Sequence, residues 1–463
     1  MECILEGLQH KLQSICQQSR FNFFFLHFDL SIFYQITCIL IHKTRHPSPR
    51  VSSVITDIRQ FSQWRCTSNN YCIKDEEKKK EEEEMLRKSV HRLTVVVKHM
   101  KLTAQMSTAA TDEVIFQKYD TKGVVTLNRP KALNALNLSM IRKIFPKLTE
   151  WENDPKMKLV IMKGTGDKAF CAGGDVRAVT EAGKVGDRLA QDFFKEEYKL
   201  NNKIGTYHMP YIAIINGITM GGGVGLSVHG TFRVATEKTV FAMPETAIGL
   251  FPDVGGGYFL SRLGGKLGIY LALTGFRLTG RDVQKAGIAT HFIQSNKIGE
   301  LEKSLLELED PTTQDIHRLL DQFQKDSTDI EDKEFVLAKD MEKIGSLFNG
   351  HTMEEIFEKL EADGSEWAKI QLNTLKKMSP TSMKVTLRQL LEGETMTLQD
   401  CLVMEYRLSQ HCIEDHDFYE GVRAVLVDRD QSPKWKPAVI EGVTPQKVEW
   451  YFSPLPEERE LRL

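Results

Sequence analysis

The sequence lacks a marked excess of charge and a framework of cysteines. Its 463 residues include 61 lysines and arginines against 63 acidic residues, so no overall field favours nucleic acid or a membrane surface as a partner. Five of the eight cysteines lie before residue 73, and only Cys171, Cys401 and Cys412 follow. This uneven distribution is not that of a disulfide framework. No C-x-x-C pair occurs, so a zinc motif built on paired cysteines is not indicated either. We expect Cys171 to be a small buried residue rather than a nucleophile.

The sequence also lacks several motifs that define common catalytic sites. Neither the glycines at 221–223 nor GGKLG at 264–268 are followed by the Gly-Lys-Ser/Thr of a phosphate-binding loop. No serine stands in a G-x-S-x-G turn, and no H-E-x-x-H metal motif occurs. His208, His229 and His291 occur singly, and we expect them to have structural roles. The sequence therefore implies no metal and no redox cofactor.

The first 84 residues differ in composition from the rest. Residues 21–41 form an apolar run nearly long enough to span a bilayer, but Asp29 near its middle disfavours insertion. Residues 74–84, KDEEKKKEEEE, are typical of a solvated spacer. We expect residues 1–84 to be a divergent, disordered extension without stable membrane insertion.

Residues 85–112 have the composition of a targeting segment. Within them, 85–111 contain serine, threonine and several lysines and arginines but no acid, as in mitochondrial transit peptides. Such a signal acts at an N-terminus, so one interpretation is that translation of the functional form starts at Met85. A basic linker is the alternative that the sequence leaves open.

Residues 113–295 have the pattern of an α/β domain. Two β-rich runs joined by T-K-G predict a hairpin, and Asn137 can cap a helix that runs to about Trp151. Apolar runs at 159–164 and 210–218 predict buried strands, and further strands follow. Strands that alternate with helices at this spacing indicate an α/β fold.

Residues 296–463 predict a mostly helical C-terminal region. Charged runs such as HRLLDQFQKD and MEEIFEKLEADG are typical of amphipathic helices, and two longer helices are expected near 383–392 and 396–412. The sequence thus predicts a catalytic α/β domain followed by a helical region.

Two glycine-rich turns follow predicted strands. In AFCAGGDV (169–176), Gly173 and Gly174 leave backbone N–H groups accessible, and Asp175 can cap the next helix. In INGITMGGGVGLSV (215–228), three glycines can bring N–H groups close to a ligand, although a tight helix–strand crossing would need the same small residues. Together the two turns can supply the two N–H donors that an oxyanion hole requires.

Two acids stand in an apolar segment stiffened by proline, PETAIGLFPDVGGG (244–257). Glu245 and Asp253 each follow a proline directly. Burying an unpaired charge in a core strand costs free energy, so fold stability does not explain two acids in apolar surroundings. Beside a carbonyl held by an oxyanion hole, a carboxylate of raised pKa can act as a base or a nucleophile.

These motifs, in this order, resemble the crotonase (enoyl-coenzyme A hydratase/isomerase) superfamily. The resemblance rests on GVVTLNRPKALNAL, AFCAGGD, INGITMGGGVGL, FAMPETAIGLFPDVGGG and DVQKAGIATHF. The strings SPTSMKVTLRQL, MEYRLSQ and DFYEGVRAVLVDRDQSPKWKP extend it to about residue 440 and resemble one branch, mitochondrial hydrolases that cleave 3-hydroxyisobutyryl-coenzyme A in valine breakdown. The fold implied is a ββα superhelix with helices after it.

The resemblance also implies roles for particular residues. The thioester carbonyl is expected between the backbone N–H groups of Gly174 and Gly222. Glu245 matches one of the two catalytic glutamates of hydratases, whereas Gly225 stands where the other would be. The missing acid disfavours the addition of water to a double bond.

Two further acids match the hydrolase branch. Asp253 is expected to be catalytic with Glu245, and Glu197 in FFKEEYKLNN is expected to bind substrate together with Gly222 and both of those acids. Glu245 would either attack the carbonyl or deprotonate a water, and the sequence does not choose between these mechanisms.

The implied activity is hydrolysis of an acyl-coenzyme A thioester in the mitochondrial matrix, with 3-hydroxypropionyl-coenzyme A as a second candidate substrate. Coenzyme A enters as part of the substrate, and no separate cofactor is implied. The alternatives are an enoyl-coenzyme A hydratase or isomerase and a non-catalytic acyl-coenzyme A binder. A homo-oligomer is left open, because the sequence does not determine the oligomeric state.

Overall fold

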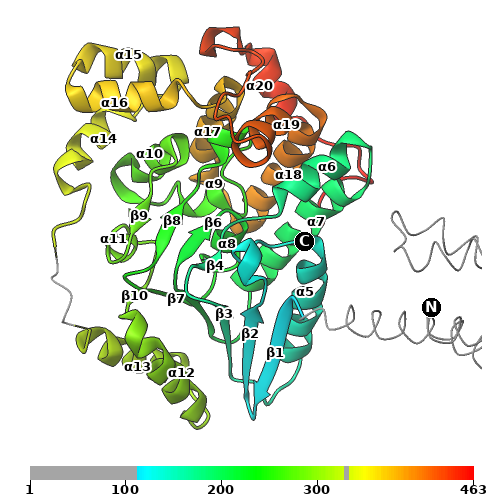
Figure 1. Ribbon diagram of the computed structural model, residues 1–463, viewed down its shortest axis with the longest axis vertical. Coiled ribbons are helices and arrows are strands. Elements are labelled where there is room, and N and C mark those ends of the chain that lie inside the picture. Colours follow the sequence, from blue (N-terminus) through cyan, green and yellow to red (C-terminus); the bar gives the residue numbers. More distant parts are fainter. Residues whose placement is uncertain (1–111, 328–332) are drawn as a thin grey trace, which may run out of the picture. The chain divides into compact units, whose positions relative to one another are not determined.

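The computed structural model describes residues 112–327 and 333–463 (Figure 1). The extension at 1–84, the apolar run at 21–41 and nearly all of the basic segment at 85–112 lie outside these residues. Thr111–Leu463 forms one compact unit.

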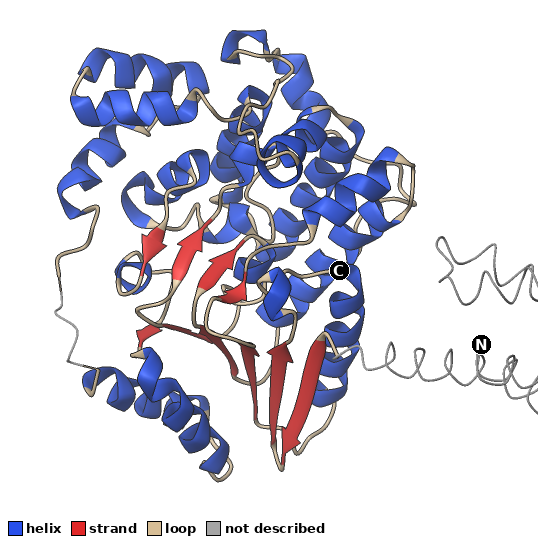
Figure 2. Cartoon of the chain, viewed as in Figure 1, coloured by secondary structure: helices blue, strands red, loops and turns tan. Residues whose placement is uncertain are grey.

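In the residues that the structure describes, ten strands form two sheets. Figure 2 shows the strands in red. The six-stranded sheet has the order β1-β2-β3-β5-β7-β10, and the four-stranded sheet has the order β4-β6-β8-β9. All neighbouring strands are parallel except β1 with β2 and β8 with β9. The strands are β1 (Val114–Tyr119), β2 (Lys122–Leu127), β3 (Leu159–Gly164), β4 (Ala169–Cys171), β5 (Tyr211–Ile215), β6 (Ile218–Met220), β7 (Phe232–Ala235), β8 (Val240–Ala242), β9 (Leu278–Thr279) and β10 (His291–Phe292).

From β3 to β8, successive strands contribute alternately to the two sheets. The pairs β3 and β4, β5 and β6, and β7 and β8 each place the first strand in the large sheet and the second in the small one. Helices lie between these pairs along the chain, so the path repeats strand, strand, helix. This path has the form of the ββα superhelix that the sequence resemblance predicts.

The helices fall into those of the α/β part and those that follow the last strand. The first group is α5 (Leu138–Glu152), α6 (Val176–Lys184), α7 (Leu189–Gly205), α8 (Gly222–Gly225), α9 (Gly256–Phe259), α10 (Leu267–Thr274) and α11 (Asp282–Lys285), with the 3-10 helices η1 (Pro130–Ala132), η2 (Glu245–Ile248) and η3 (Gly264–Lys266). The second group is η4 (Ser295–Lys297), α12 (Ile298–Glu307), α13 (Thr313–Lys325), η5 (Ala338–Asp340), α14 (Met341–Leu347), α15 (Met353–Asp363), α16 (Glu366–Leu375), α17 (Pro380–Gly393), α18 (Leu398–Glu414), α19 (Asp417–Val422), the π-helix η6 (Arg423–Val427), η7 (Ile440–Gly442) and α20 (Pro445–Phe452).

Local sequence signals account for the first elements. The predicted hairpin forms, with Lys122 opposite Tyr119. The Asn137 side chain accepts a hydrogen bond from Met140 N at the start of α5, which satisfies one of the otherwise unpaired helix donors. Asp175 lies at the corresponding position of α6 but makes no capping bond, because its carboxylate instead pairs with Arg129 at 3.1 Å. The predicted capping role of Asp175 is therefore wrong.

The six-stranded sheet has a core on each face. Alternate residues of a strand point to opposite faces, so Val124, Ile161 and Ile212 pack with α12 and α13, whereas Val125 and Val160 belong to the larger core. The larger core also takes in α17 and α18 of the C-terminal region. The catalytic motifs lie on the side of this larger core.

As predicted, the described residues of the C-terminal region form helices joined by loops, and they contain no strand. The last strand ends at Phe292 and a 3-10 helix begins at Ser295, while the domain boundary at 295 stays a prediction. Helices α17 and α18 pack against α9, so this region contributes to the surroundings of the catalytic motifs. Among the helices of 112–327 and 333–463, none is both long and apolar enough to cross a membrane.

Candidate active site

In the first glycine turn, the backbone N–H group of Gly174 points away from the neighbouring segment at Leu136. It follows β4, and Gly173 has φ +109°, a value that favours glycine. Leu136 N donates to Gly173 O at 2.9 Å, and Asp175 N donates to Leu136 O at 2.8 Å. Since successive backbone groups alternate in direction, the N–H of Gly174 points away from Leu136.

The second glycine turn meets the first. Gly221 has φ +43° and precedes α8, where the N–H of Gly222 is at a helix start and has no partner within the helix. A Cβ atom built on Gly222 would lie 3.2 Å from Gly174 N. The N–H groups of Gly174 and Gly222 therefore belong to adjoining backbone segments, as an oxyanion hole requires.

Two buried glutamates flank the second turn. Glu245 begins η2, and a Cβ atom on Gly221 would lie 2.9 Å from its Oε1. Glu197 lies on α7, and a Cβ atom on Gly222 would lie 2.6 Å from its Oε1. Any side chain at either glycine would collide with a carboxylate, so the glycines make room for the two acids.

These glutamates keep oxygens without protein partners. Within the part of the chain that the structure describes, Glu197 Oε1 and Glu245 Oε2 are buried and accept no hydrogen bond. Leaving a buried polar atom unpaired costs about 1–3 kcal/mol, and more for a charged group. Such atoms indicate a place built for a polar ligand rather than for fold stability.

Asp253 is the third buried acid of the site. It is 4% exposed, and its carboxylate accepts a hydrogen bond from the hydroxyl of Tyr198 at 2.9 Å. Tyr198 follows Glu197 on α7, so this helix carries both the Glu197 carboxyl group and the hydroxyl group that bonds to Asp253. The next residue, Val254, has φ +53°, an unfavourable value for a β-branched side chain. Local strain of this kind is often found at functional sites.

Burial raises the pKa of all three carboxyl groups. The pKa of Glu197 is well above its ordinary value, first through burial and then through the charges of Asp253 and Glu245. The pKa of Glu245 is likewise well raised by burial and by Asp253, and burial raises the pKa of Asp253 to about 7. No lysine, arginine or histidine of the described residues pairs with them. The three groups therefore share protons and titrate together.

A fourth buried acid, Glu405 of α18, holds the segment after Asp253. Its Oε2 accepts from Gly255 N at 2.7 Å and its Oε1 accepts from Gly257 N at 2.8 Å. Gln389 of α17 donates to the same carboxylate at 3.0 Å. Burial raises the pKa of Glu405 to about 8. The C-terminal helices thus fix the backbone that carries Asp253.

Asn201 occupies the space beside Gly225. It is fully buried one helical turn after Glu197, and both polar atoms of its amide lack a partner among the described residues. A Cβ atom on Gly225 would lie 2.6 Å from Asn201 Nδ2 and 2.7 Å from Val254 Cβ. An acid at position 225, where a hydratase would have one, does not fit this structure.

The structure therefore brings together Gly174, Glu197, Gly222, Glu245 and Asp253. Sequence reasoning missed three neighbours of these residues. Asn201 carries a usable signal, because the position four residues after Glu197 lies on the same side of a helix, whereas Tyr198 is adjacent in sequence but points to another side.

Glu405 carries no such signal, because it lies 150 residues after Gly255, to which it bonds. The predicted burial of Cys171 is confirmed, and burial raises the pKa of its thiol to about 12.

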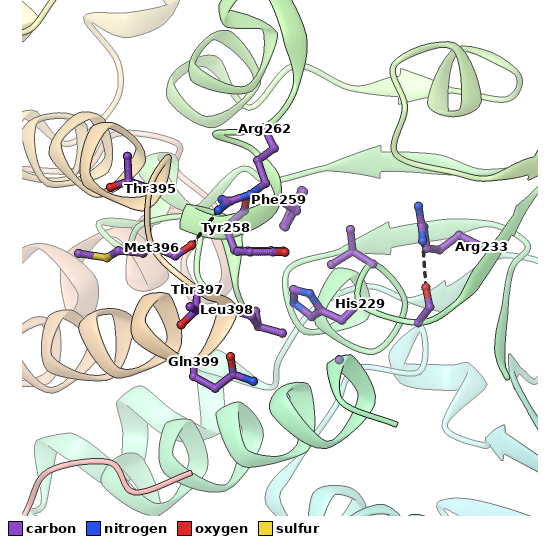
Figure 3. Close-up of a pocket in the computed structure, with 13 residues that line it drawn as sticks. His229, Arg233, Tyr258, Phe259, Arg262, Thr395, Met396, Thr397, Leu398 and Gln399 are labelled. Atoms are coloured by element: carbon purple, nitrogen blue, oxygen red, sulfur yellow. Dashed lines mark hydrogen bonds between the residues drawn. The ribbon is translucent and has the colours of Figure 1, made fainter. Parts of the chain in front are cut away.

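A separate cavity of about 530 Å³ contains none of these acids (Figure 3). Its guanidinium groups are already occupied: Arg262 donates to the carbonyls of Tyr258, Gly393 and Met396. His229 borders this cavity and donates to Val254 O at 2.7 Å. This hydrogen bond helps to hold the segment after Asp253 in place. The acid cluster differs from this cavity in its buried carboxyl oxygens without protein partners.

Residues 122–452, well over half of the chain, match the family model described as enoyl-CoA hydratase/isomerase. The chain belongs to this family. Two solved structures share its fold: a carnitinyl-CoA dehydratase from Mycobacterium thermoresistibile (TM-score 0.70, 37% identity, 76% of this chain and 99% of that one) and an enoyl-CoA hydratase from Rhodobacter sphaeroides 2.4.1 (TM-score 0.68, 35% identity, 76% and 100%). The predicted α/β crotonase-like fold is confirmed.

Curated relatives place the chain within one branch of the family. Proteins named 3-hydroxyisobutyryl-CoA hydrolase, mitochondrial, are 62% identical over 372 residues in Xenopus laevis, 61% over 376 in Danio rerio and 57% over 364 in Homo sapiens. These alignments cover 80%, 81% and 79% of this chain and 96%, 97% and 94% of the relatives. The branch that the sequence motifs resemble is the branch of these relatives.

Proposed function

We propose that this protein hydrolyses the thioester of 3-hydroxyisobutyryl-CoA to the free hydroxy acid and coenzyme A, a step of valine breakdown. The name and high identity of the curated relatives support this substrate. The observation that carries the mechanism is the pair of buried, unpartnered carboxyl oxygens of Glu197 and Glu245 beside the two glycine turns. The shorter 3-hydroxypropionyl-CoA carries the same hydroxyl and thioester and is a second substrate.

The backbone of the glycine turns stabilises the transition state. When the thioester carbonyl becomes tetrahedral, its oxygen gains negative charge, and the N–H groups of Gly174 and Gly222 donate to it. Each donor of this kind lowers the barrier by roughly 3–4 kcal/mol in known enzymes. Because both donors are backbone groups of fixed turns, they need little reorganisation during the reaction.

Glu245 supplies the base or the nucleophile. In one route its carboxylate takes a proton from water, the hydroxide oxygen bonds to the carbonyl carbon, and the carbon–sulfur bond breaks with a proton passing to the thiolate. In the other, the carboxylate itself bonds to that carbon and expels the thiolate, and water then hydrolyses the anhydride. Both routes release one thiol for each water consumed and draw only on protein groups, water and substrate.

The other two acids orient the reacting groups. Asp253, with its hydrogen bond from Tyr198, directs the water or the 3-hydroxyl group towards Glu245. Glu197 Oε1 occupies the space beside Gly222 where a side chain would project, and it offers an oxygen to the substrate hydroxyl. This arrangement favours hydroxyacyl chains over plain acyl chains, because an unpaired buried polar group penalises the analogue that lacks the hydroxyl.

Hydrolysis is favoured over hydration by the surroundings of Gly225. Hydration in this family uses a second glutamate there, as the resemblance implies, and Asn201 with Val254 fills that space. An assay of free thiol release against double-bond hydration on a panel of acyl-CoA thioesters tests the choice. We expect thiol release from the 3-hydroxyacyl thioesters, and hydration without thiol release would reject the proposal.

The name of the relatives and the basic segment at 85–111 support a mitochondrial location. Mass spectrometry of the N-terminus of protein isolated from its own cells tests import and processing. A mature chain that begins near residues 105–112 is expected. Retention of residues 1–84 in the mature protein would contradict this assignment.

A further inference from the structure

Three metal-binding side chains meet on the face of the six-stranded sheet that lies away from the acid cluster. His291 is the first residue of β10, and it pairs in register with Val234 of β7, which belongs to the core beneath α13. His317 and Asp321 lie four residues apart on α13 and therefore on one side of that helix. Figure 1 shows α13 next to β10. The strand and the helix thus direct all three side chains into the same space.

The distances between the candidate ligand atoms suit a small divalent ion. His291 Nε2 lies 3.4 Å from Asp321 Oδ1, and His317 Nδ1 lies 3.3 Å from Asp321 Oδ2. One ligand atom from each of the three residues can be chosen so that all three atoms lie within 4.8 Å of one another. Ligands held about 2.0–2.1 Å from a tetrahedral zinc are separated by roughly 3.3 Å.

The second ring nitrogen of His291 is already occupied. Its Nδ1 is 2.9 Å from Thr290 Oγ1, which leaves Nε2 as the nitrogen that faces Asp321. Metal-binding histidines are commonly oriented in this way by a partner at the other nitrogen. Phe232 packs against both imidazole rings, with centroid distances of 5.9 and 6.1 Å, and forms an apolar wall.

The cluster is open to solvent on one side. The His291 side chain is only 4% exposed, whereas those of His317 and Asp321 are 57% and 43% exposed. A metal ion has an entry path, and water can supply the fourth ligand.

From this geometry we propose that His291 Nε2, His317 Nδ1 and the Asp321 carboxylate bind a divalent transition metal of borderline softness, with zinc as the best match. Two imidazoles and a carboxylate favour zinc over magnesium or calcium, which prefer oxygen ligands. The bound ion links α13 to the edge strand of the sheet and has a structural role. The sequence does not indicate this site, because His291 lies 26 residues before His317 and no motif joins them.

Calorimetric titration of Zn²⁺ into the metal-stripped full-length protein tests the proposal. We expect a site of unit stoichiometry, a higher thermal unfolding midpoint with Zn²⁺, and the visible bands of tetrahedral Co²⁺ after substitution with cobalt. His317→Ala and Asp321→Asn should each weaken binding at least about tenfold. The exposed His351, which is not in the cluster, provides the matched control, and His351→Ala should leave binding unchanged.

Three outcomes would overturn the proposal. One is the absence of a saturable site at micromolar Zn²⁺, which would mean that the cluster is an ion pair only. Another is binding that His317→Ala and Asp321→Asn leave intact. The third is a sulfur-to-cobalt charge-transfer band, which would assign the metal to cysteine. None of these outcomes bears on thioester hydrolysis, which uses the other face of the sheet.

Discussion

Two aspartates of this protein accept a hydrogen bond from a tyrosine, and their pKa values move in opposite directions. Asp253 accepts from Tyr198 at 2.9 Å, and burial raises its pKa to about 7. Asp415 at the end of α18 accepts from Tyr451 at 2.7 Å. Burial acts to raise the pKa of Asp415 as well, but hydrogen bonds from Lys447 and Tyr451 outweigh it, and the pKa is lowered.

The difference between the two sites is the counter-ion. Lys447 lies 2.6 Å from Asp415, whereas the charges that act on Asp253 are those of other carboxyl groups, Glu197 and Glu245 among them. A buried acid paired with a cation stabilises the fold, and a buried acid grouped with other acids destabilises it. The unpaired group is the one that has a chemical use, because its proton affinity lies near neutral pH.

The largest expected effect comes from the acid beside the second glycine turn. Glu245→Gln removes the base or nucleophile while keeping the shape of the side chain, so thiol release should fall by at least roughly 10²–10⁴-fold. Binding of a non-hydrolysable acyl-CoA analogue, measured by calorimetry, should survive. Asp415→Asn is the matched control and should leave turnover essentially unchanged. Full turnover by Glu245→Gln would remove this residue from the mechanism.

The next largest effect comes from Glu405, which holds the backbone after Asp253 in position. Glu405→Gln replaces one of the two oxygens that accept from Gly255 and Gly257, so one buried N–H loses its partner. We expect kcat to fall on the order of tenfold, with a smaller change in KM, because the segment that carries Asp253 loses its fixed position.

The exposed Glu394 provides the control for Glu405, and Glu394→Gln should leave both kinetic constants unchanged. The measurement is made well below the unfolding midpoint, so that a loss of folded protein cannot imitate a loss of position. An unchanged kcat in Glu405→Gln would show that α18 does not position the site.

The contrast between Glu245 and Glu405 also shows what sequence can predict. Glu245 stands within a local motif, and Gly221, which makes room for its carboxylate, lies within 25 residues of it. Spacing and composition are therefore enough to indicate Glu245 as a candidate site residue. The hairpin, the Asn137 cap and the buried strands are local in the same way. Glu405 acts on Gly255 through a contact across 150 residues, and only the packing of α18 on α9 brings the two together.

The third expected effect separates the two aspartates by the pH dependence of stability. An ordinary Asp has a pKa of about 3.9. The pKa of Asp253 is raised in the folded state, so its contribution to stability is fully present below the ordinary pKa and is lost as pH rises from there through about 7. Asp253→Asn should therefore raise the free energy of unfolding clearly at pH 8 and change it little near pH 4.

Asp415→Asn should show the opposite sign. Its pKa is lowered in the folded state, so its stabilisation is present above the ordinary value and is lost as pH falls through the folded value. We expect this variant to be less stable than the parent at pH 7 and to approach it in stability below about pH 4. Urea unfolding at several pH values measures both variants, and the same sign for both would contradict the comparison.

The smallest expected effect isolates the tyrosine hydroxyls. The hydrogen bond from Tyr198 favours the ionised form of Asp253 and so lowers its pKa. Tyr198→Phe removes that bond, the acid cluster holds its protons to higher pH, and the rise of kcat/KM with pH should move upward by about half a unit to one unit. Tyr451→Phe removes the equivalent bond at Asp415 and should leave the pH–rate profile in place. A shift of equal size in both variants would mean that the profile reports global stability rather than the protonation of the three carboxyl groups.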